Sequence, residues 1–242
     1  HEEYEDLARL GLWPKNKLVT VESGKIDHLI PVLQALETRI ITIAQSERPG
    51  LLAYLNNLGL TEVSNAAIVD IGYSATVQGY LNDLINKGIN GYYLMTRKRA
   101  EQVSSKYKVI AQGYFCHYIH PDINSPVILR ESFSLEKLLS SDDAQIVSYR
   151  QADSGDILPE FRHLADEERL SMLKRAEIRR GIMDFVNQSI MIRDKLVSDF
   201  KVPPDIAIDL FEEFIAHPSQ AEQDILGALV LDDHYCGRGI VS

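Results

Sequence analysis

Residues 66–96 read AAIVDIGYSATVQGYLNDLINKGINGYYLMT, and this stretch decides the fold. It contains two apolar runs, at residues 66–71 and 89–95, that have the length and residue types of buried strands. Between them, residues 76–87 place apolar side chains at helical spacing, and Gly88 follows as a helix stop. A helix between two buried strands predicts a right-handed crossover that joins two parallel strands.

Helical patterns and one further strand surround this unit. On its N-terminal side, helices are expected at residues 2–10, 27–45 and 49–59. On its C-terminal side, residues 109–119 read as a further strand, or as two strands with a bulge at Gly113. We therefore expect an α/β fold, in which a Rossmann-like parallel sheet forms the core and helices are added at both ends.

The second half of the chain is mostly helical in pattern. Its expected elements are helices at 131–140, 166–200, 204–216 and 219–231, a strand at 145–150, and a polar loop or hairpin at 151–161. We place the α/β core with its N-terminal helices in residues 1–150 and the helical extension in residues 151–242. No linker or shift in composition marks a sharp boundary between them.

Composition excludes several classes of function. The chain has 242 residues, of which 45% are hydrophobic, so it can bury a core as one large domain or two small ones. Its formal net charge of -10 argues against a nucleic-acid binder and against docking on anionic lipid. No apolar run is long enough for a membrane span, and the acidic N-terminus lacks the pattern of a signal peptide. We expect a cytoplasmic protein, which can be a piece of a longer chain because it starts at His1.

The two cysteines are far apart in the sequence. Cys116 and Cys236 form no C-x-x-C pair, so free thiols in a reducing compartment are the simplest interpretation. A disulfide between them stays open at this stage.

The residues after the first strand are candidates for a binding site. Asp70 ends the strand, and parallel strands bring their last residues to the edge where open α/β sheets bind ligands. Gly72 lets a ligand approach the backbone, while Ser74 and Thr76 can bond an anion at the N-terminus of the next helix. Asp70 is the candidate catalytic residue, since a carboxylate there can hold a proton, a ribose hydroxyl or a metal ion such as Mg²⁺. The alternative is structural, because these residue types are also common in caps and turns.

Three basic residues follow the second strand. Arg97, Lys98 and Arg99 are expected at the same edge as Asp70, where they can neutralise a bound phosphate. The alternative is a solvated basic turn. Two known phosphate-binding templates do not fit the loop, because no lysine follows it as in a P-loop and the three glycines of the dinucleotide fingerprint are absent.

A longer pattern surrounds this loop. In chain order, the sequence contains SERPGLLAYLNNLGL, AIVDIGYSATVQGYL, INGYYLMT, ESFSLEKLLSSDDAQIVSY and HPSQAEQDILGAL, followed by Tyr-Cys-Gly at 235–237. Together, over about residues 40–237, they resemble a region of predicted haloacid-dehalogenase-superfamily (HAD-like) proteins from bacterial surface-polysaccharide clusters. That region lies downstream of the phosphatase-like domain. Such proteins are often fused or adjacent to glycosyltransferases.

The loop in that family reads V-D-[IV]-G-[WY]-x-G-[ST]-x-Q, and here Ala75 replaces the second glycine. The resemblance implies a companion module of the phosphatase, because D-I-G stands where the D-x-D nucleophile motif would be needed. The residues that match the loop are Asp70, Gly72, Tyr73, Thr76 and Gln78. The full expected ligand-binding set is Gly72, Tyr73, Ser74, Thr76, Gln78, Arg97 and Lys98, with no metal ligands assigned.

Three functions follow from these features. The first is a module of polysaccharide assembly that binds a sugar phosphate or nucleotide sugar, with or without transferase activity; it predicts that Asp70, Ser74, Thr76, Gln78 and residues 97–99 converge on one pocket. The second is a non-catalytic scaffold that docks other domains of a larger parent chain; it predicts that Tyr73 and Gln78 pack inward and that an apolar patch is exposed. The third, which we rank last, is a degenerate phosphatase.

Other polar groups have simpler explanations. Cys116, His117, His120 and Asp122 could form a zinc cluster. The segment reads as a strand that leads to a turn, and on a strand Cys116 and His117 point to opposite faces. Glu131 and Glu136 are spaced poorly for one helix face. The long helix expected at residues 166–200 mixes basic and acidic side chains, which is typical of an exposed, salt-bridged helix face. These residues are Lys174, Arg175, Arg179 and Arg180, among Glu167, Glu168 and Glu177.

Overall fold

The chain is described here from a computed structural model. The described residues are 5, 8–9, 27–120, 125–164, 166–198, 201–233 and 239–241. They belong to two compact units, His1–Tyr54 with Ser148–Leu158, and Leu55–Val147 with Pro159–Ser242. The helix expected at residues 2–10 lies mostly outside the described residues. The proposed domain boundary near residue 150 stays a prediction.

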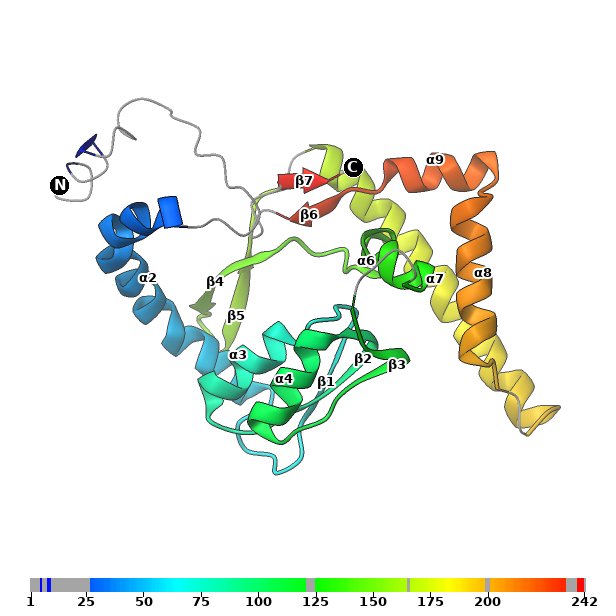
Figure 1. The fold of residues 1–242 in the computed structure, drawn as a ribbon, viewed down its shortest axis with the longest axis horizontal. Helices are drawn as coiled ribbons and strands as arrows, with labels where there is room; N and C mark the ends of the chain where they lie inside the picture. Colours follow the sequence, from blue (N-terminus) through cyan, green and yellow to red (C-terminus); the bar gives the residue numbers. More distant parts are fainter. Residues whose placement is uncertain are drawn as a thin grey trace. The chain divides into compact units, whose positions relative to one another are not determined.

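The second unit contains a three-stranded parallel sheet in the order β1-β2-β3, formed by β1 (Ala67–Asp70), β2 (Asn90–Arg97) and β3 (Ala111–Ile119). Two helices join the strands, α3 (Thr76–Ile85) and α4 (Lys98–Tyr107), and they contact each other on one face of the sheet (Figure 1). Right-handed crossovers that advance in one direction place both helices on the same face. The expected Rossmann-like α/β core is therefore confirmed.

Helix α4 excludes the basic turn that was one of the two interpretations of residues 97–99. Arg97 is the last residue of β2 and Lys98 is the first residue of α4, so the strand runs directly into the helix. The helix escaped notice because it is polar, with Ala100 as its one buried residue. Two parallel strands need a long crossover connection, and this connection usually contains a helix.

Two small cores hold the sheet. On the side of α3 and α4, Tyr93 packs against Ala75, Ala100 and Ala111. In the other, Met95 packs against α5 (Val127–Arg130) and α6 (Ser132–Leu139), with support from α8 (Pro204–Ala216). Because α5, α6 and α8 are brought onto the sheet in this way, the C-terminal helices belong to the same unit as the sheet.

Strand β3 is irregular, as the sequence predicted. Between Gly113 and Cys116 it carries one more residue than β2 does between Tyr93 and Met95, which defines a bulge directly after Gly113. A Cβ on Gly113 would overlap the carbonyl oxygen of Cys116 and lie 2.9 Å from the Cα of Met95. Glycine is required because both obstacles are backbone atoms.

The C-terminal part contains the predicted strand and hairpin, β4 (Ile146–Gln151) and β5 (Ile157–Phe161), and the long helix α7 (Asp166–Lys195). Helix α9 (Gln220–Ala228) begins with a capping box between Ser219 and Glu222. The expected helix at 219–231 is too long, because the chain leaves α9 after Ala228 and enters β6 (Leu231–Asp233), which pairs with β7 (Gly239–Val241). Leu229 is fully buried at this exit and fixes it.

In the first unit, one helix replaces two that were expected. After the short 3-10 turn η1 (Asp27–Leu29), α2 (Ile30–Asn57) runs through Pro49, so the proline lies inside a helix instead of opening one. The rings of Tyr54, on α2, and Tyr149 form a tilted aromatic pair with their centroids 5.1 Å apart. Among the helices of the described residues, none is long and apolar enough to cross a bilayer.

Candidate functional site

The loop between β1 and α3 borders a cavity of about 320 Å³. The carboxyl end of β1 contributes Asp70, and the start of α3 contributes Thr76 and Val77. Asp70 Oδ1 accepts a hydrogen bond of 2.7 Å from the backbone N–H of Gly72, which folds the loop back over the strand end. The sequence thus predicted the position of the cavity, and the remaining loop residues that line it are Ile71, Gly72, Tyr73, Ser74 and Ala75.

The N-terminus of α3 has no side-chain cap. Its N-cap is Ala75, which adopts the left-handed conformation with φ 55° and is almost fully buried. Neither Ser74 nor Thr76 is the N-cap residue of α3, so a capping role does not explain them. A left-handed residue suits glycine, and glycine is the residue that the resembling family carries at this position. An uncapped helix start presents N–H groups and a partial positive charge to the cavity.

Glu136 of helix α6 and Ser140, the residue that follows this helix, line the same cavity. The spacing of Glu131 and Glu136 argued against a carboxylate pair on one helix face, and the fold instead places Glu136 on the same cavity as Asp70. No sequence signal could have found this pairing, because it depends on how α6 packs against the sheet. Two carboxylates on one cavity are enough for Mg²⁺ bound together with a phosphate.

Tyr73 packs against the core that contains Met95, and Arg97 lies over the Tyr73 ring. The backbone N–H of Arg97 donates 2.8 Å to the carbonyl of Tyr73, and the guanidinium carbon lies 4.0 Å from the centre of the Tyr73 ring. Arg97 Nε is buried without a hydrogen-bond partner in the part of the chain described. Arg97 therefore steadies the loop through Tyr73 and does not line the cavity.

Lys98 and Arg99 do not converge on the cavity either. Lys98 forms an ion pair with Glu101 on its own helix. Arg99 lines a separate cavity of about 210 Å³ between α3 and α4, and Thr76 is shared by both cavities.

Gln78 is buried beneath the site. Its side chain is fully buried, its Nε2 donates to the carbonyls of Ile89 at 2.6 Å and Ile110 at 2.8 Å, and its Oε1 accepts 2.9 Å from the hydroxyl of Tyr93. A Cβ on Gly91 would overlap this amide, so the strand also needs glycine where Gln78 enters. The side chain thus ties α3 to the starts of β2 and β3, and every polar atom it carries is used.

Tyr93, which donates a hydrogen bond to Gln78, also interacts electrostatically with Asp70. Burial, with a smaller contribution from the negative charge of Asp70, raises the pKa of the Tyr93 hydroxyl far above its ordinary value. The phenol therefore stays protonated and serves as a hydrogen-bond donor.

The histidine and cysteine group gives no metal site among the described residues. His117 Nδ1 accepts a hydrogen bond of 3.2 Å from the N–H of Gly113 across the bulge. Cys116 is a half-buried free thiol, and burial raises its pKa. Asp122 and Cys236 lie outside the described residues.

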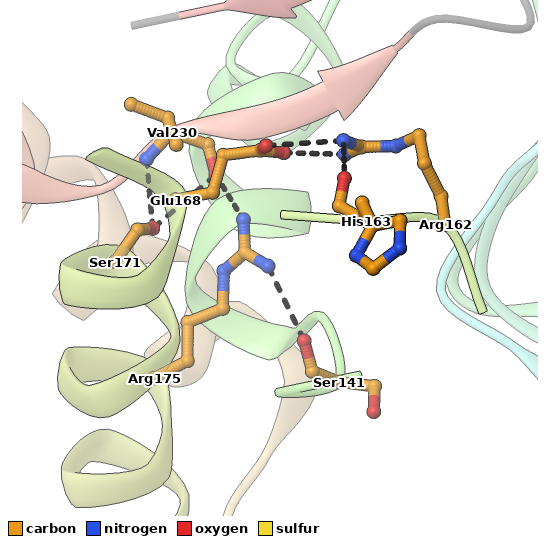
Figure 2. Close-up of polar contacts among 7 residues, drawn as sticks. All are labelled: Ser141, Arg162, His163, Glu168, Ser171, Arg175 and Val230. Carbon is orange, nitrogen blue, oxygen red and sulfur yellow. Dashed lines mark hydrogen bonds and ion pairs between the residues drawn. The ribbon is translucent and has the colours of Figure 1, made fainter. Parts of the chain in front are cut away.

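A second polar cluster, at the start of α7, was missed by the sequence analysis (Figure 2). Arg175 is buried, and its guanidinium donates 3.2 Å to the carbonyl of Ser141 and also to the carbonyl of Val230. The N–H of Val230 donates 2.9 Å to the hydroxyl of Ser171, one turn earlier on the helix. These bonds hold the chain after α9 against α7.

The acidic member of this cluster is Glu168, which is buried and forms an ion pair with Arg162. Arg162 also donates 2.7 Å to the carbonyl of His163. The expectation that this stretch is an exposed salt-bridged face is therefore wrong for Glu168 and Arg175, which face inward. The pKa of nearby Lys137 is lowered, mainly by burial and to a smaller extent by the positive charge of Arg175. The adjoining cavity holds only about 20 Å³, so the cluster is a structural clasp.

No protein-family model matches the chain, and no curated protein is significantly similar to it. The fold by itself defines an α/β protein with a three-stranded parallel sheet and a helical extension. The resemblance to polysaccharide-cluster proteins stays a prediction from the quoted motifs.

Proposed function

We propose that the chain is a module of a bacterial surface-polysaccharide biosynthesis protein that binds a sugar phosphate or nucleotide sugar over the Asp70 cavity. The observation that carries this proposal is the uncapped N-terminus of α3, which opens into a cavity of about 320 Å³ at the carboxyl edge of the sheet. Cavities of this size and place bind small ligands in α/β proteins. The quoted loop motif supports the choice of ligand class.

Each side of the cavity has a distinct part in this proposal. The N–H groups of Thr76 and Val77 receive the phosphate, because a helix start favours an anion. Asp70 and Glu136 accept hydrogen bonds from sugar hydroxyls or hold a Mg²⁺ ion that neutralises them beside the phosphate. Gln78 supports the site from beneath the cavity and Arg97 supports the loop through Tyr73, whereas Lys98 has no part in the proposed binding. If the module catalyses transfer, Asp70 is the residue that would hold the proton or the metal.

Calorimetric titration of the full chain with a nucleoside-diphosphate hexose and a hexose 1-phosphate, each with and without Mg²⁺, tests this proposal. Asp70→Asn is the informative variant, since asparagine still accepts the Gly72 N–H while its charge is lost. We expect binding that weakens by roughly tenfold, as for loss of one charged hydrogen bond. Asp156→Asn, in the exposed tip of the β4–β5 hairpin, is the matched control and should bind as wild type. Absence of binding at millimolar ligand with an intact fold contradicts the proposal.

A second candidate function, a docking scaffold for other domains of the parent chain, is favoured by the exposed surface of the sheet. Val69 is 86% exposed, its register partner Tyr92 is 43% exposed, and Tyr114 on β3 is 61% exposed. Parallel sheets are normally covered on both faces. Gln78 is also packed inward, as this alternative requires.

Sedimentation velocity of the chain mixed with the remaining domains of the parent protein separates the two functions. A scaffold forms a complex that Tyr114→Lys abolishes and that Asp70→Asn leaves intact. If no complex forms, or if both variants form it equally, the scaffold alternative is wrong.

A further inference from the structure

A second cavity adjoins the Asp70 cavity and has no part in the proposed function. It lies between α3 and α4 and has a volume of about 210 Å³. Its walls are α3 from Thr76 to Asp83 and α4 from Arg99 to Tyr107, and we call it the α3–α4 cavity. Thr76, the first residue of α3, lines both cavities, so one ligand can extend from the first into the second.

Gly79 leaves the floor of the α3–α4 cavity open. It is buried within α3, where a Cβ would lie 3.6 Å from Val103 Cγ2 and 3.9 Å from Tyr107 Cε2. Both are ordinary contact distances, so the packing of the two helices leaves room for an alanine. Glycine weakens the interior of a helix. The missing side chain therefore enlarges the cavity and is not needed for the helices to approach each other.

The charges of the α3–α4 cavity are divided between its two ends. At the C-terminal ends of the helices, Lys106 Nζ lies 3.3 Å from the Asp83 carboxylate and donates to the Tyr107 hydroxyl. Arg99 lies in the first turn of α4 and is exposed, and its side chain forms no ion pair or hydrogen bond with another described residue. Because α3 and α4 connect parallel strands, they run in the same direction, and Arg99 lies at the end of the cavity where Thr76 begins α3.

The junction of the two cavities therefore suits two linked phosphates. The first phosphate, next to the sugar, binds the N–H groups of Thr76 and Val77 at the uncapped start of α3, as in the proposed function. The second faces Arg99, whose planar guanidinium can form two hydrogen bonds with one phosphate. A hexose 1-phosphate carries only the first of these groups, whereas a nucleoside-diphosphate hexose carries both.

The volumes of the two cavities match the two ends of such a ligand. A water molecule takes about 30 Å³ in the liquid, so about 210 Å³ holds about seven non-hydrogen atoms and about 320 Å³ holds about eleven. These are the sizes of a pyrimidine ring and of a hexose. Tyr80, which is 67% exposed on the wall of the α3–α4 cavity, offers an aromatic surface on which a base can stack, and Gln102 offers an amide for its polar edge.

We propose that the chain binds a pyrimidine nucleoside-diphosphate hexose in preference to a hexose 1-phosphate. The hexose lies in the Asp70 cavity, the diphosphate between Thr76 and Arg99, and the base in the α3–α4 cavity. This inference rests on the proposed function and narrows its ligand class. Arg99 is the residue that distinguishes the two ligands, because its charge acts on the second phosphate.

Calorimetric titration of the full chain with uridine diphosphate glucose and with glucose 1-phosphate, both in the presence of Mg²⁺, tests this preference. The wild type should bind the nucleotide sugar at least about tenfold more tightly. Arg99→Gln should weaken its binding by roughly tenfold and leave the affinity for glucose 1-phosphate within about twofold of wild type. Lys98→Gln removes the same charge one residue away and outside both cavities, so this matched control should bind both ligands as wild type.

The possible results separate this inference from the proposed function. If neither ligand binds at millimolar concentration, the proposed function fails and the inference fails with it. If both ligands bind the wild type equally well, or if Arg99→Gln and Lys98→Gln weaken the nucleotide sugar alike, the sugar-phosphate site stands and the nucleotide assignment is wrong. An equal loss of both ligands in Arg99→Gln would also overturn the assignment of Arg99 to the second phosphate. Far-ultraviolet circular dichroism verifies that each variant is folded.

Discussion

Replacing Gln78 by methionine should destabilise the fold strongly, although the sequence places this residue in a ligand-binding set. Methionine has a similar size, so the packing change alone costs less than about 1.5 kcal/mol. The loss of the amide leaves the carbonyls of Ile89 and Ile110 and the hydroxyl of Tyr93 without their partner. Each buried polar group left unsatisfied costs about 1–3 kcal/mol, so we expect a loss of about 4 kcal/mol.

A loss of this size is a large share of the 5–15 kcal/mol by which domains are typically stable. Urea unfolding followed by circular dichroism measures it as a fall in the midpoint of roughly 1–2 M. Gln102→Met, on the exposed side of α4, is the matched control and should change the free energy of unfolding by less than about 0.5 kcal/mol. A loss below about 1 kcal/mol in Gln78→Met, together with lost ligand binding, would refute the structural role argued for this side chain.

Four further substitutions test other parts of the account. Gly113→Ala should cost about 3 kcal/mol in urea unfolding, because the added Cβ meets only backbone atoms, whereas Gly181→Ala, with open space around it in α7, should stabilise by up to about 1 kcal/mol. Because the pKa of Tyr93 is raised on folding, its contribution to stability is complete below about pH 10 and declines as the pH rises further; in Tyr93→Phe this alkaline decline should be shallower. Arg175→Lys should lower the thermal midpoint by several degrees, since a lysine cannot donate to two separate carbonyls in the same geometry, and an unchanged midpoint would show that the clasp contributes little.

The parts of the fold that local pattern determines could be predicted. The alternation of buried strand, helix and strand over residues 66–96 fixed the parallel sheet, since a crossover of this length permits little else. Gly113 marked the bulge in β3 because glycine inside an apolar run has few other uses. Polar α4 was missed because its pattern carries few apolar residues, and α2 was divided in two because its tolerance of Pro49 depends on context that no window of sequence contains.

The candidate site could be predicted only in part. The loop and its strand end are local, so Asp70, Gly72 and Thr76 were placed correctly on one cavity. Glu136 reaches that cavity through the packing of a distant helix, for which the sequence offers no signal. Gln78 was assigned by its place in a motif, yet burial decides its role, and burial is a property of the whole fold.

Amide chemical shifts test the central claim, that the Asp70 cavity binds a phosphorylated sugar, most directly. Titrating a hexose 1-phosphate into the ¹⁵N-labelled chain should shift the backbone N–H resonances of Gly72, Thr76 and Val77, and Asp70→Asn should weaken the effect. Resonances of the β4–β5 hairpin should stay in place. If millimolar ligand leaves the resonances of residues 71–77 unchanged, or shifts only signals elsewhere in the chain, this loop is not the binding site.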